Sequence, residues 1–126
     1  MDGAALLFFS GHEGALPLFS ALDAALRTAA DGVSVKVQKT QISYYSRHLF
    51  ACVSFLPVRK AAARPKDFVT LTLCLPARLI SSRVDQAVEP YPNRWTHHLT
   101  LSDPAEIDAE LTGWIGEAAA FAAAKR

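Results

Sequence analysis

The sequence predicts an α+β fold in two layers: a four- to five-stranded, mainly antiparallel sheet with the N- and C-terminal helices packed on one face. Three observations lead to this prediction. Helical patterns stand near both ends of the chain, apolar and polar residues alternate through the middle, and most connections between consecutive strands are short. Both helices are amphipathic and need an apolar partner, which the Val, Ile and Leu side of the sheet provides.

The composition is that of a globular protein. The chain has 126 residues, of which 51% are hydrophobic and 20% charged, so we expect one compact domain over residues 1–126. Its 13 basic and 12 acidic residues give a formal net charge of +1, which makes nucleic acid an unexpected partner. The N-terminus lacks the pattern of a signal peptide, and no apolar run approaches the ~20 residues that cross a bilayer. We therefore expect a cytoplasmic protein with no membrane association.

The first predicted helix follows Ser10, which stands three residues before Glu13 in the spacing of a capping box. A helix accepts Pro17 only in its first turn, so the start is predicted between residues 14 and 16. Gly32 is predicted to cap the C-terminus. Residues at helical spacing form the buried face: Leu16, Phe19, Leu22 and Leu26.

Strands are predicted at residues 33–37, 40–45, 49–56, 68–75 and 94–101. The fourth alternates most clearly, with Val and Leu on one side and Thr70 and Thr72 on the other. The third is apolar on both sides, as expected of a covered central strand. The connection 76–93 is unusually long and contains two prolines, so we expect a functional loop with a short helical turn around 82–87.

The last predicted helix has the clearest start. Asp103 is the expected N-cap, Pro104 takes the first helical position, and Glu106 completes a capping box. The buried stripe of this helix is predicted to be Ile107, Leu111, Trp114, Ile115, Ala118 and Phe121. The core of the domain is predicted to include Phe19, Leu22, Leu71, Leu73, Leu99, Leu111 and Trp114.

Two adjacent histidines lie on the fifth predicted strand. Neighbouring side chains of a strand point to opposite faces, so His97 and His98 cannot share one role. Leu99 and Leu101 must face the helices, which places His97 in the core, partly buried and donating to a backbone or carboxylate oxygen. His98 then lies on the open face, where an imidazole with its ordinary pKa of about 6.5 is able to transfer protons.

The same parity rule makes the open face polar and rich in hydroxyl groups. One interpretation is a concave surface that holds a small anionic or polar ligand, closed over by the loop 76–93. The other is a solvated antiparallel face with no ligand. The basic loop from Arg59 to Lys66 is open to similar alternatives, phosphate contact or plain solvation. The candidate ligand-binding residues are Lys39, Gln41, Tyr45, Arg94 and His98.

Cys52 and Cys74 lie inside apolar strands and are predicted to be buried free thiols, since a disulfide requires neighbouring strands in register. A zinc site that adds His98 to them lacks the usual ligand spacing, and burial disfavours a thiolate nucleophile. The chain has no phosphate-binding glycine loop and no G-x-S-x-G elbow. We expect no metal, no cofactor and no catalytic residue.

Three stretches of the sequence resemble a small bacterial family, the domain of unknown function 5655. They are residues 8–12 with 15–19, residues 37–44 leading to Phe50 and Ala51, and residues 94–99 followed by 107–111 and Trp114-Ile115. The resemblance implies a single compact domain, found alone or appended to other proteins. It implies no activity, and it favours Lys39, Arg94 and His98 as a shared polar site.

Two functions, and a third arrangement, are compatible with this pattern. The first is a binding or interaction module without chemistry of its own. The second is a small hydrolase or transferase with His98 as acid/base and with Lys39 and Arg94 stabilising an anion. The third is a homodimer formed through the same face. The pattern supplies no carboxylate to orient the imidazole, which favours binding over catalysis.

Overall fold

The computed structural model describes residues 2–125. Three α-helices, three short 3-10 turns and six strands follow one another along the chain. Their order is α1 (Gly3–Phe8), η1 (Glu13–Ala15), α2 (Leu16–Arg27), β1 (Ser34–Val37), β2 (Gln41–Ser46), β3 (His48–Ser54), η2 (Ala61–Ala63), β4 (Val69–Leu75), β5 (Gln86–Tyr91), β6 (Arg94–Leu101), η3 (Pro104–Glu106) and α3 (Ala109–Ala124).

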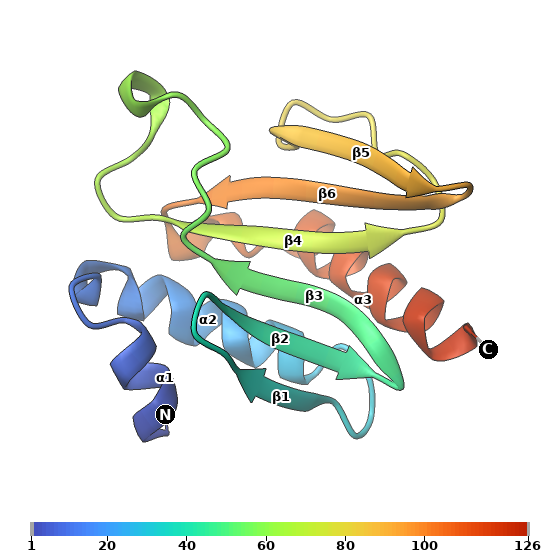
Figure 1. The fold of residues 1–126 in the computed structure, drawn as a ribbon, viewed down its shortest axis with the longest axis horizontal. Coiled ribbons are helices and arrows are strands. Elements are labelled where there is room, and N and C mark those ends of the chain that lie inside the picture. Colours follow the sequence, from blue (N-terminus) through green and yellow to red (C-terminus); the bar gives the residue numbers. More distant parts are fainter. Residues whose placement is uncertain (1, 126) are drawn as a thin grey trace.

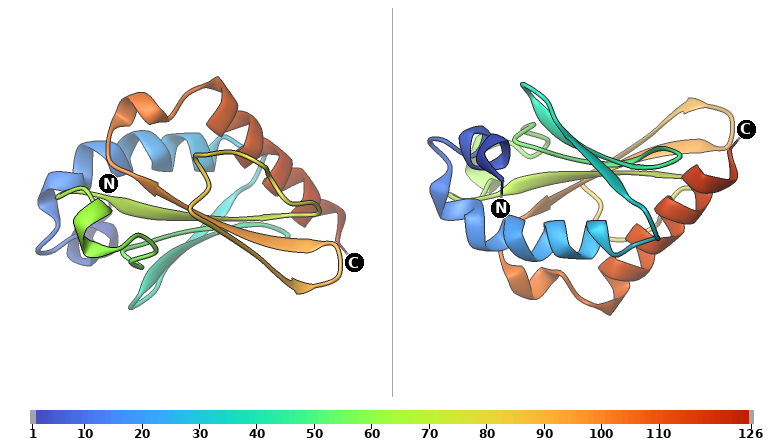
Figure 2. Two further views of the ribbon diagram at one scale, coloured as in Figure 1. Left: turned by 90° about the horizontal axis from the view of Figure 1, so that it is seen from above. Right: turned by 90° about the horizontal axis from the view of Figure 1, so that it is seen from below.

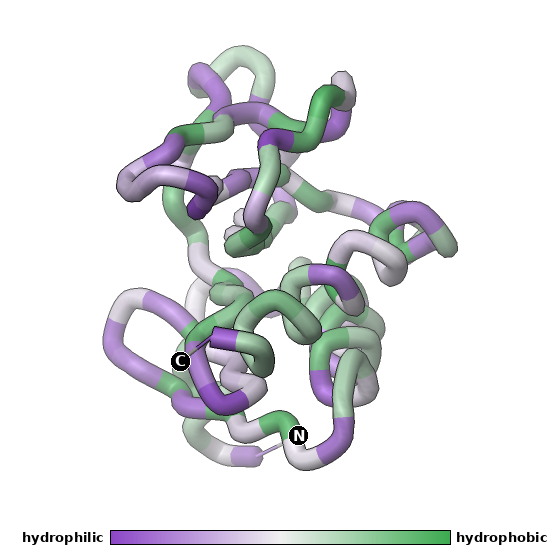
Figure 3. Tube along the Cα trace, turned by 90° about the vertical axis from the view of Figure 1, so that its right-hand side faces the viewer, coloured by the Kyte–Doolittle hydropathy of each residue, from purple (hydrophilic) through white to green (hydrophobic). Residues whose placement is uncertain are grey.

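The strands form one antiparallel sheet in the order β1-β2-β3-β4-β6-β5. Helices α2 and α3 cover the same face of the sheet. Figure 2 shows the sheet edge-on with both helices on one side, and Figure 1 shows the sheet in front with both helices behind it. Figure 3 shows hydrophobic and hydrophilic residues interspersed along the trace. Because neighbouring side chains of a strand point to opposite faces, the buried Leu71 and Leu73 lie on one face of β4 and Thr70 and Thr72 on the other. The two-layer α+β prediction is confirmed.

The sheet has six strands, more than the four to five predicted, because the connection 76–93 contains β5. The helical turn predicted at 82–87 is reduced to one hydrogen-bonded turn, in which the N–H of Val84 donates to the carbonyl of Ser81, because β5 starts at Gln86. The strand was missed because it contains Pro90, and proline has no N–H to donate to a neighbouring strand. Proline is accepted in a sheet at edge strands or bulges, where that hydrogen bond is not needed. β5 lies at the sheet edge, and its pairing with β6 shifts register between Val88 and Tyr91.

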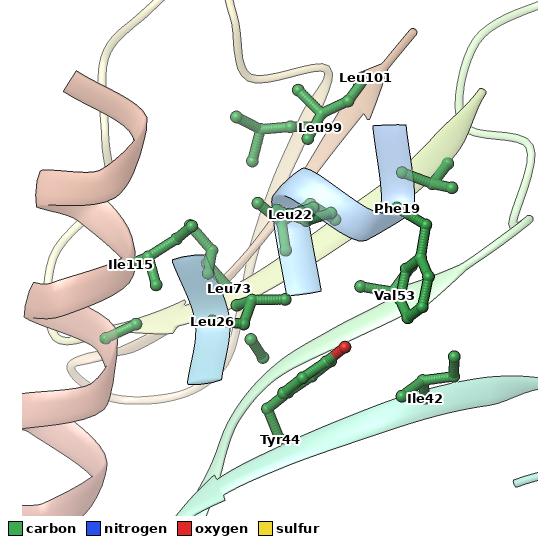
Figure 4. Close-up of a cluster of buried hydrophobic side chains, with 14 of the residues drawn as sticks. Phe19, Leu22, Leu26, Ile42, Tyr44, Val53, Leu73, Leu99, Leu101 and Ile115 are labelled. Carbon is green, nitrogen blue, oxygen red and sulfur yellow. The ribbon is translucent and has the colours of Figure 1, made fainter. Parts of the chain in front are cut away.

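The core fills the space between the sheet and the helices α2 and α3 (Figure 4). Of the predicted core residues, Phe19, Leu22, Leu71, Leu73, Leu99 and Leu111 are at most 1% exposed. Trp114 differs, because its ring is only partly buried and carries the Arg83 guanidinium 5.7 Å from its centroid. Tyr44 brings a polar group into this layer, and its hydroxyl donates to Asp23 on α2 at 2.7 Å.

The N-terminal region differs from the prediction. An additional helix, α1, is capped by Asp2, whose carboxylate accepts the N–H of Ala5 at 2.8 Å. The Glu13 carboxylate accepts the N–H of Gly11, so the predicted capping box with Ser10 does not form.

Helix α2 starts at Leu16, inside the predicted interval, and ends at Arg27 with Thr28 as its C-cap. The predicted C-cap Gly32 lies in the turn before β1, where its φ of +68° suits glycine.

The capping box at Asp103 forms, but it caps η3 rather than α3. Helix α3 begins five residues later than predicted, at Ala109, with Asp108 as N-cap and an Asp108 Oδ1 to Leu111 N distance of 3.0 Å. The Arg83 guanidinium also bonds the Asp108 carboxylate at 2.9 Å, which holds the connection before β5 against the start of α3.

Strand β3 contains a bulge that the sequence pattern disguised. Tyr44 pairs with Ala51 and Tyr45 pairs with Leu49, which leaves Phe50 as an extra residue. Phe50 and Ala51 both belong to the core as a result. The apolar content on both parities of this strand thus reflects a bulge as well as a central position.

Candidate ligand cavity on the open face

The sheet face turned away from α2 and α3 carries rows of polar side chains. Strand register aligns Ser43, Cys52, Thr72 and His98 across β2, β3, β4 and β6. Ser43 is 0% exposed even though it lies on this side. The open face is therefore covered in part, and the covering segments do not belong to α2 or α3.

Two segments flank the open face at one end of the sheet. One is α1 with the connection to η1, and the other is the loop that leaves β3 at residue 55 and returns to β4 at residue 68 (Figures 1 and 2). The Thr70 hydroxyl donates to the carbonyl of Leu56, which holds the start of the loop over the sheet. The end of the loop meets the other flank, because the Asp67 carboxylate lies where a Cβ on Gly14 would be.

The two flanks and the sheet line a half-open cavity of about 550 Å³. This volume lies within the range of small-molecule sites in proteins. Its floor consists of Cys52, Ser54, Thr72 and His98, its rim of residues 39–41, and its flanks of Phe8, Ser10, His12, Phe55 and Leu56.

Aromatic rings form one wall of the cavity. The His12 imidazole stacks on the Phe55 ring, with centroids 3.8 Å apart and planes at 13°. The Phe8 ring is also stacked near Phe55, with centroids 5.2 Å apart and planes at 16°. Phe9 anchors this group to the core, since its ring meets both Phe55 and Phe19. The wall is aromatic, with the two apolar rings of Phe8 and Phe55 beside the imidazole of His12, and Phe9 attaches it to the packed interior.

The two adjacent histidines lie on opposite faces, as strand parity predicts. His98 lines the cavity, with its Nδ1 2.8 Å from the Thr72 hydroxyl, and burial lowers its pKa. His97 is 0% exposed on the core side, and burial lowers its pKa as well.

The expected role of His97 as a donor needs correction. Its Nε2 accepts the N–H of Leu79 at 2.9 Å, and its Nδ1 has no hydrogen-bond partner among residues 2–125.

A hydrogen-bond network joins the side chains of Gln38, Gln41 and Ser43 at the rim beside Lys39. The Ser43 hydroxyl donates to the Gln38 side-chain oxygen at 2.7 Å and accepts from the Gln41 amide at 2.8 Å. The same Gln41 amide reaches the Cys52 sulfur at 3.2 Å. Burial raises the pKa of the Cys52 thiol to about 11, so the sulfur stays protonated near neutral pH.

The ionisable groups of the lining are one lysine, two imidazoles and this thiol, with no carboxylate among them. The Lys39 ammonium has no carboxylate within 4.0 Å among the residues that the structure describes. The cavity therefore favours negative charge in what it binds.

A family model described as a domain of unknown function, DUF5655, matches residues 7–122. The chain belongs to the DUF5655 family. All residues that line the cavity fall inside the matched range, and the resemblance seen in the sequence is confirmed. No curated protein and no solved structure matches the chain.

Three of the five candidate residues of this DUF5655 domain lie together. Lys39, Gln41 and His98 line the cavity, whereas Tyr45 and Arg94 do not. Tyr45 lies at the other end of β2, opposite Leu49. Arg94 is four residues from His98 along β6, about 13 Å at the usual strand rise, and lines a separate depression with Trp95 and Lys125. The shared patch of Lys39, Arg94 and His98 expected from the sequence does not form.

The cover of the cavity also differs from the expectation. No residue of 76–93 lines it, so the predicted closure by that loop is wrong. Sequence reasoning missed Phe8, His12 and Phe55, which form the aromatic wall. Phe8 belonged to an apolar N-terminal run and Phe55 to the end of an apolar strand, and neither pattern shows that the two segments meet.

Cys52 and Cys74 are free cysteines, the first buried and the second partly exposed. Cys52 is aligned with Thr72, two residues from Cys74, so the pair is out of register for a disulfide. Residues 2–125 hold no group of three or more His, Cys, Asp or Glu placed to bind a metal ion. Within the same range, no helix has the length and apolar character to cross a membrane.

Proposed function

We propose that this DUF5655 domain is a binding module that holds a small anionic or polar organic ligand in the open-face cavity. One observation carries the proposal. Lys39 and His98 line a single cavity of about 550 Å³ that also has an aromatic wall and no carboxylate. An apolar body packs against the rings of Phe8 and Phe55, and the Lys39 ammonium attracts the negative group.

Binding has more support than catalysis. The group that orients the His98 imidazole is the neutral hydroxyl of Thr72, and no carboxylate of residues 2–125 bonds to this ring. The Cys52 thiol, with its pKa raised to about 11, is not an activated nucleophile. A hydrolase or transferase that uses His98 as acid/base therefore lacks both a charged orienting partner and a nucleophile of suitable pKa.

Benzoate is a suitable probe because it joins a flat apolar ring to one negative charge. We expect a ¹H–¹⁵N NMR titration to move the amide signals of residues 39–41, 52–56, 72 and 98. Lys39→Gln should weaken the affinity about tenfold, the effect of losing ~1.4 kcal/mol from one charge-assisted contact. Arg94→Gln is the matched control, since it removes one cation from the same face outside the cavity, and it should leave the affinity unchanged.

Two outcomes would contradict the proposal. Benzoate could shift no amide signals at millimolar concentration, or it could shift signals mainly around residues 90–96, which would place binding in the depression beside Arg94. Signals that move with protein concentration and not with benzoate would instead favour a homodimer formed through this face.

A further inference from the structure

The chain separates its charges along the sequence. Between Asp31 and Asp67 there is no acidic residue, and this stretch holds seven of the 13 basic residues. The formal net charge of the whole protein is only +1, so the remainder of the chain is acidic. The acid-free stretch includes the rim, part of the floor and the flanking loop as far as Lys66, and Asp67 follows at the end of that loop.

Several cations of this stretch take part in no ion pair among residues 2–125. Arg59 is bound to Asp85, with Nε 2.9 Å from Oδ1. Lys39, Lys60 and Lys66 are exposed and have no carboxylate within 4.0 Å among residues 2–125. Lys39 lies in the β1–β2 turn and belongs to the cavity lining, whereas Lys60 and Lys66 lie outside the lining, on the flanking loop between β3 and β4.

The lining also fits a flat polar ring. The exposed His12 imidazole extends the stack formed with Phe55, and a planar ring of a ligand can continue such a stack. The Gln41 amide and the Ser54 hydroxyl lie in the same lining and supply hydrogen-bond donors and acceptors for ring-edge atoms.

We propose that the ligand is an organic phosphate that carries a planar heterocyclic ring, a class to which mononucleotides belong. This inference rests on the proposed function and specifies its ligand. The ring stacks on His12 inside the cavity. The phosphate sits beside Lys39 at the rim, and the flexible side chains of Lys60 and Lys66 extend to it from the flanking loop.

Isothermal titration calorimetry on the full chain at low ionic strength tests this inference with four probes: adenosine monophosphate, adenosine, ribose 5-phosphate and benzoate. We expect the nucleotide to bind at least tenfold more tightly than either of its halves. Raising the salt from 50 to 200 mM should weaken it several-fold, because exposed charges are screened. The double variant Lys60→Gln/Lys66→Gln should weaken the nucleotide about tenfold and leave benzoate unchanged, and Arg94→Gln should affect neither.

Each contrary result has a separate meaning. If adenosine binds as tightly as the nucleotide, the phosphate does not contribute to the affinity and that part of the inference is wrong. If ribose 5-phosphate binds as tightly, the ring does not contribute and the stacking on His12 is wrong. Benzoate binding without a tighter nucleotide overturns the ligand class and leaves the cavity as a binding site. If neither benzoate nor the nucleotide binds, the proposed function fails together with this inference.

Discussion

The two faces of the sheet come from the same strands and have opposite properties. On one face, side chains such as Leu73 are fully buried under α2 and α3. On the other face, the preceding residue, Thr72, lies on the floor of a cavity of about 550 Å³. Alternation along each strand decides the chemistry of both faces. The segments that cross each face decide whether it is filled or hollow, since two long helices fill one face and two irregular flanks leave space over the other.

The largest expected difference between the faces is in the free energy of unfolding. Leu73→Ala removes a fully buried side chain and should cost 2–5 kcal/mol, roughly the range for such truncations. Thr72→Ala removes a hydroxyl that bonds His98 and should cost only about 1 kcal/mol. Denaturant unfolding measures both values. Equal losses would show that the open face is packed as tightly as the core.

A second comparison uses the adjacent tyrosines of β2. The Tyr44 hydroxyl donates to the Asp23 carboxylate inside the helix-facing layer, and both burial and this carboxylate raise the pKa of Tyr44. Tyr44→Phe should cost about 1.5–3 kcal/mol, the range for a hydrogen bond to a charged group. Tyr45→Phe is the matched control, because its hydroxyl has no hydrogen bond within residues 2–125. Similar destabilisation by both variants would contradict the expected contrast.

Low pH should lower the free energy of unfolding through protonation of Asp85. Burial on its own would raise the pKa of this carboxyl, but hydrogen bonds from Arg59 and Thr100 lower it below its ordinary value. A carboxyl with a lowered pKa stabilises the folded state above its unfolded pKa of about 3.9, and this contribution is lost as the pH falls through the folded value.

Asp85→Asn should therefore cost about 1 kcal/mol at pH 7 and much less near pH 2. Denaturant midpoints measured at both pH values check this expectation. A variant whose deficit stays constant between them would show that the ionised carboxylate is not what matters.

Local sequence patterns predicted the fold class and the side of each strand, as the opposite placement of His97 and His98 shows. They predicted the site only in part, because parity places residues on a face and not at a position along it. Arg94 shares a face with His98 yet lies about 13 Å away along β6. The aromatic wall needed contacts between residues far apart in the chain, such as His12 with Phe55, which periodicity does not encode.

The smallest expected effect is a change in the pKa of one of the two adjacent histidines, and it is also the most direct test of the central claim. We claim that one face is packed and the other holds a ligand cavity, and each histidine reports on one face. An NMR pH titration of the imidazole signals, with and without benzoate, compares them in one sample. We expect His98 to titrate below pH 6.5, because burial lowers its pKa, and benzoate to raise that pKa, because a nearby anion favours the imidazolium. His97, buried and fixed by the N–H of Leu79, should not respond to benzoate. A ligand-dependent shift at His97 with none at His98 would contradict the assignment of the cavity to the open face.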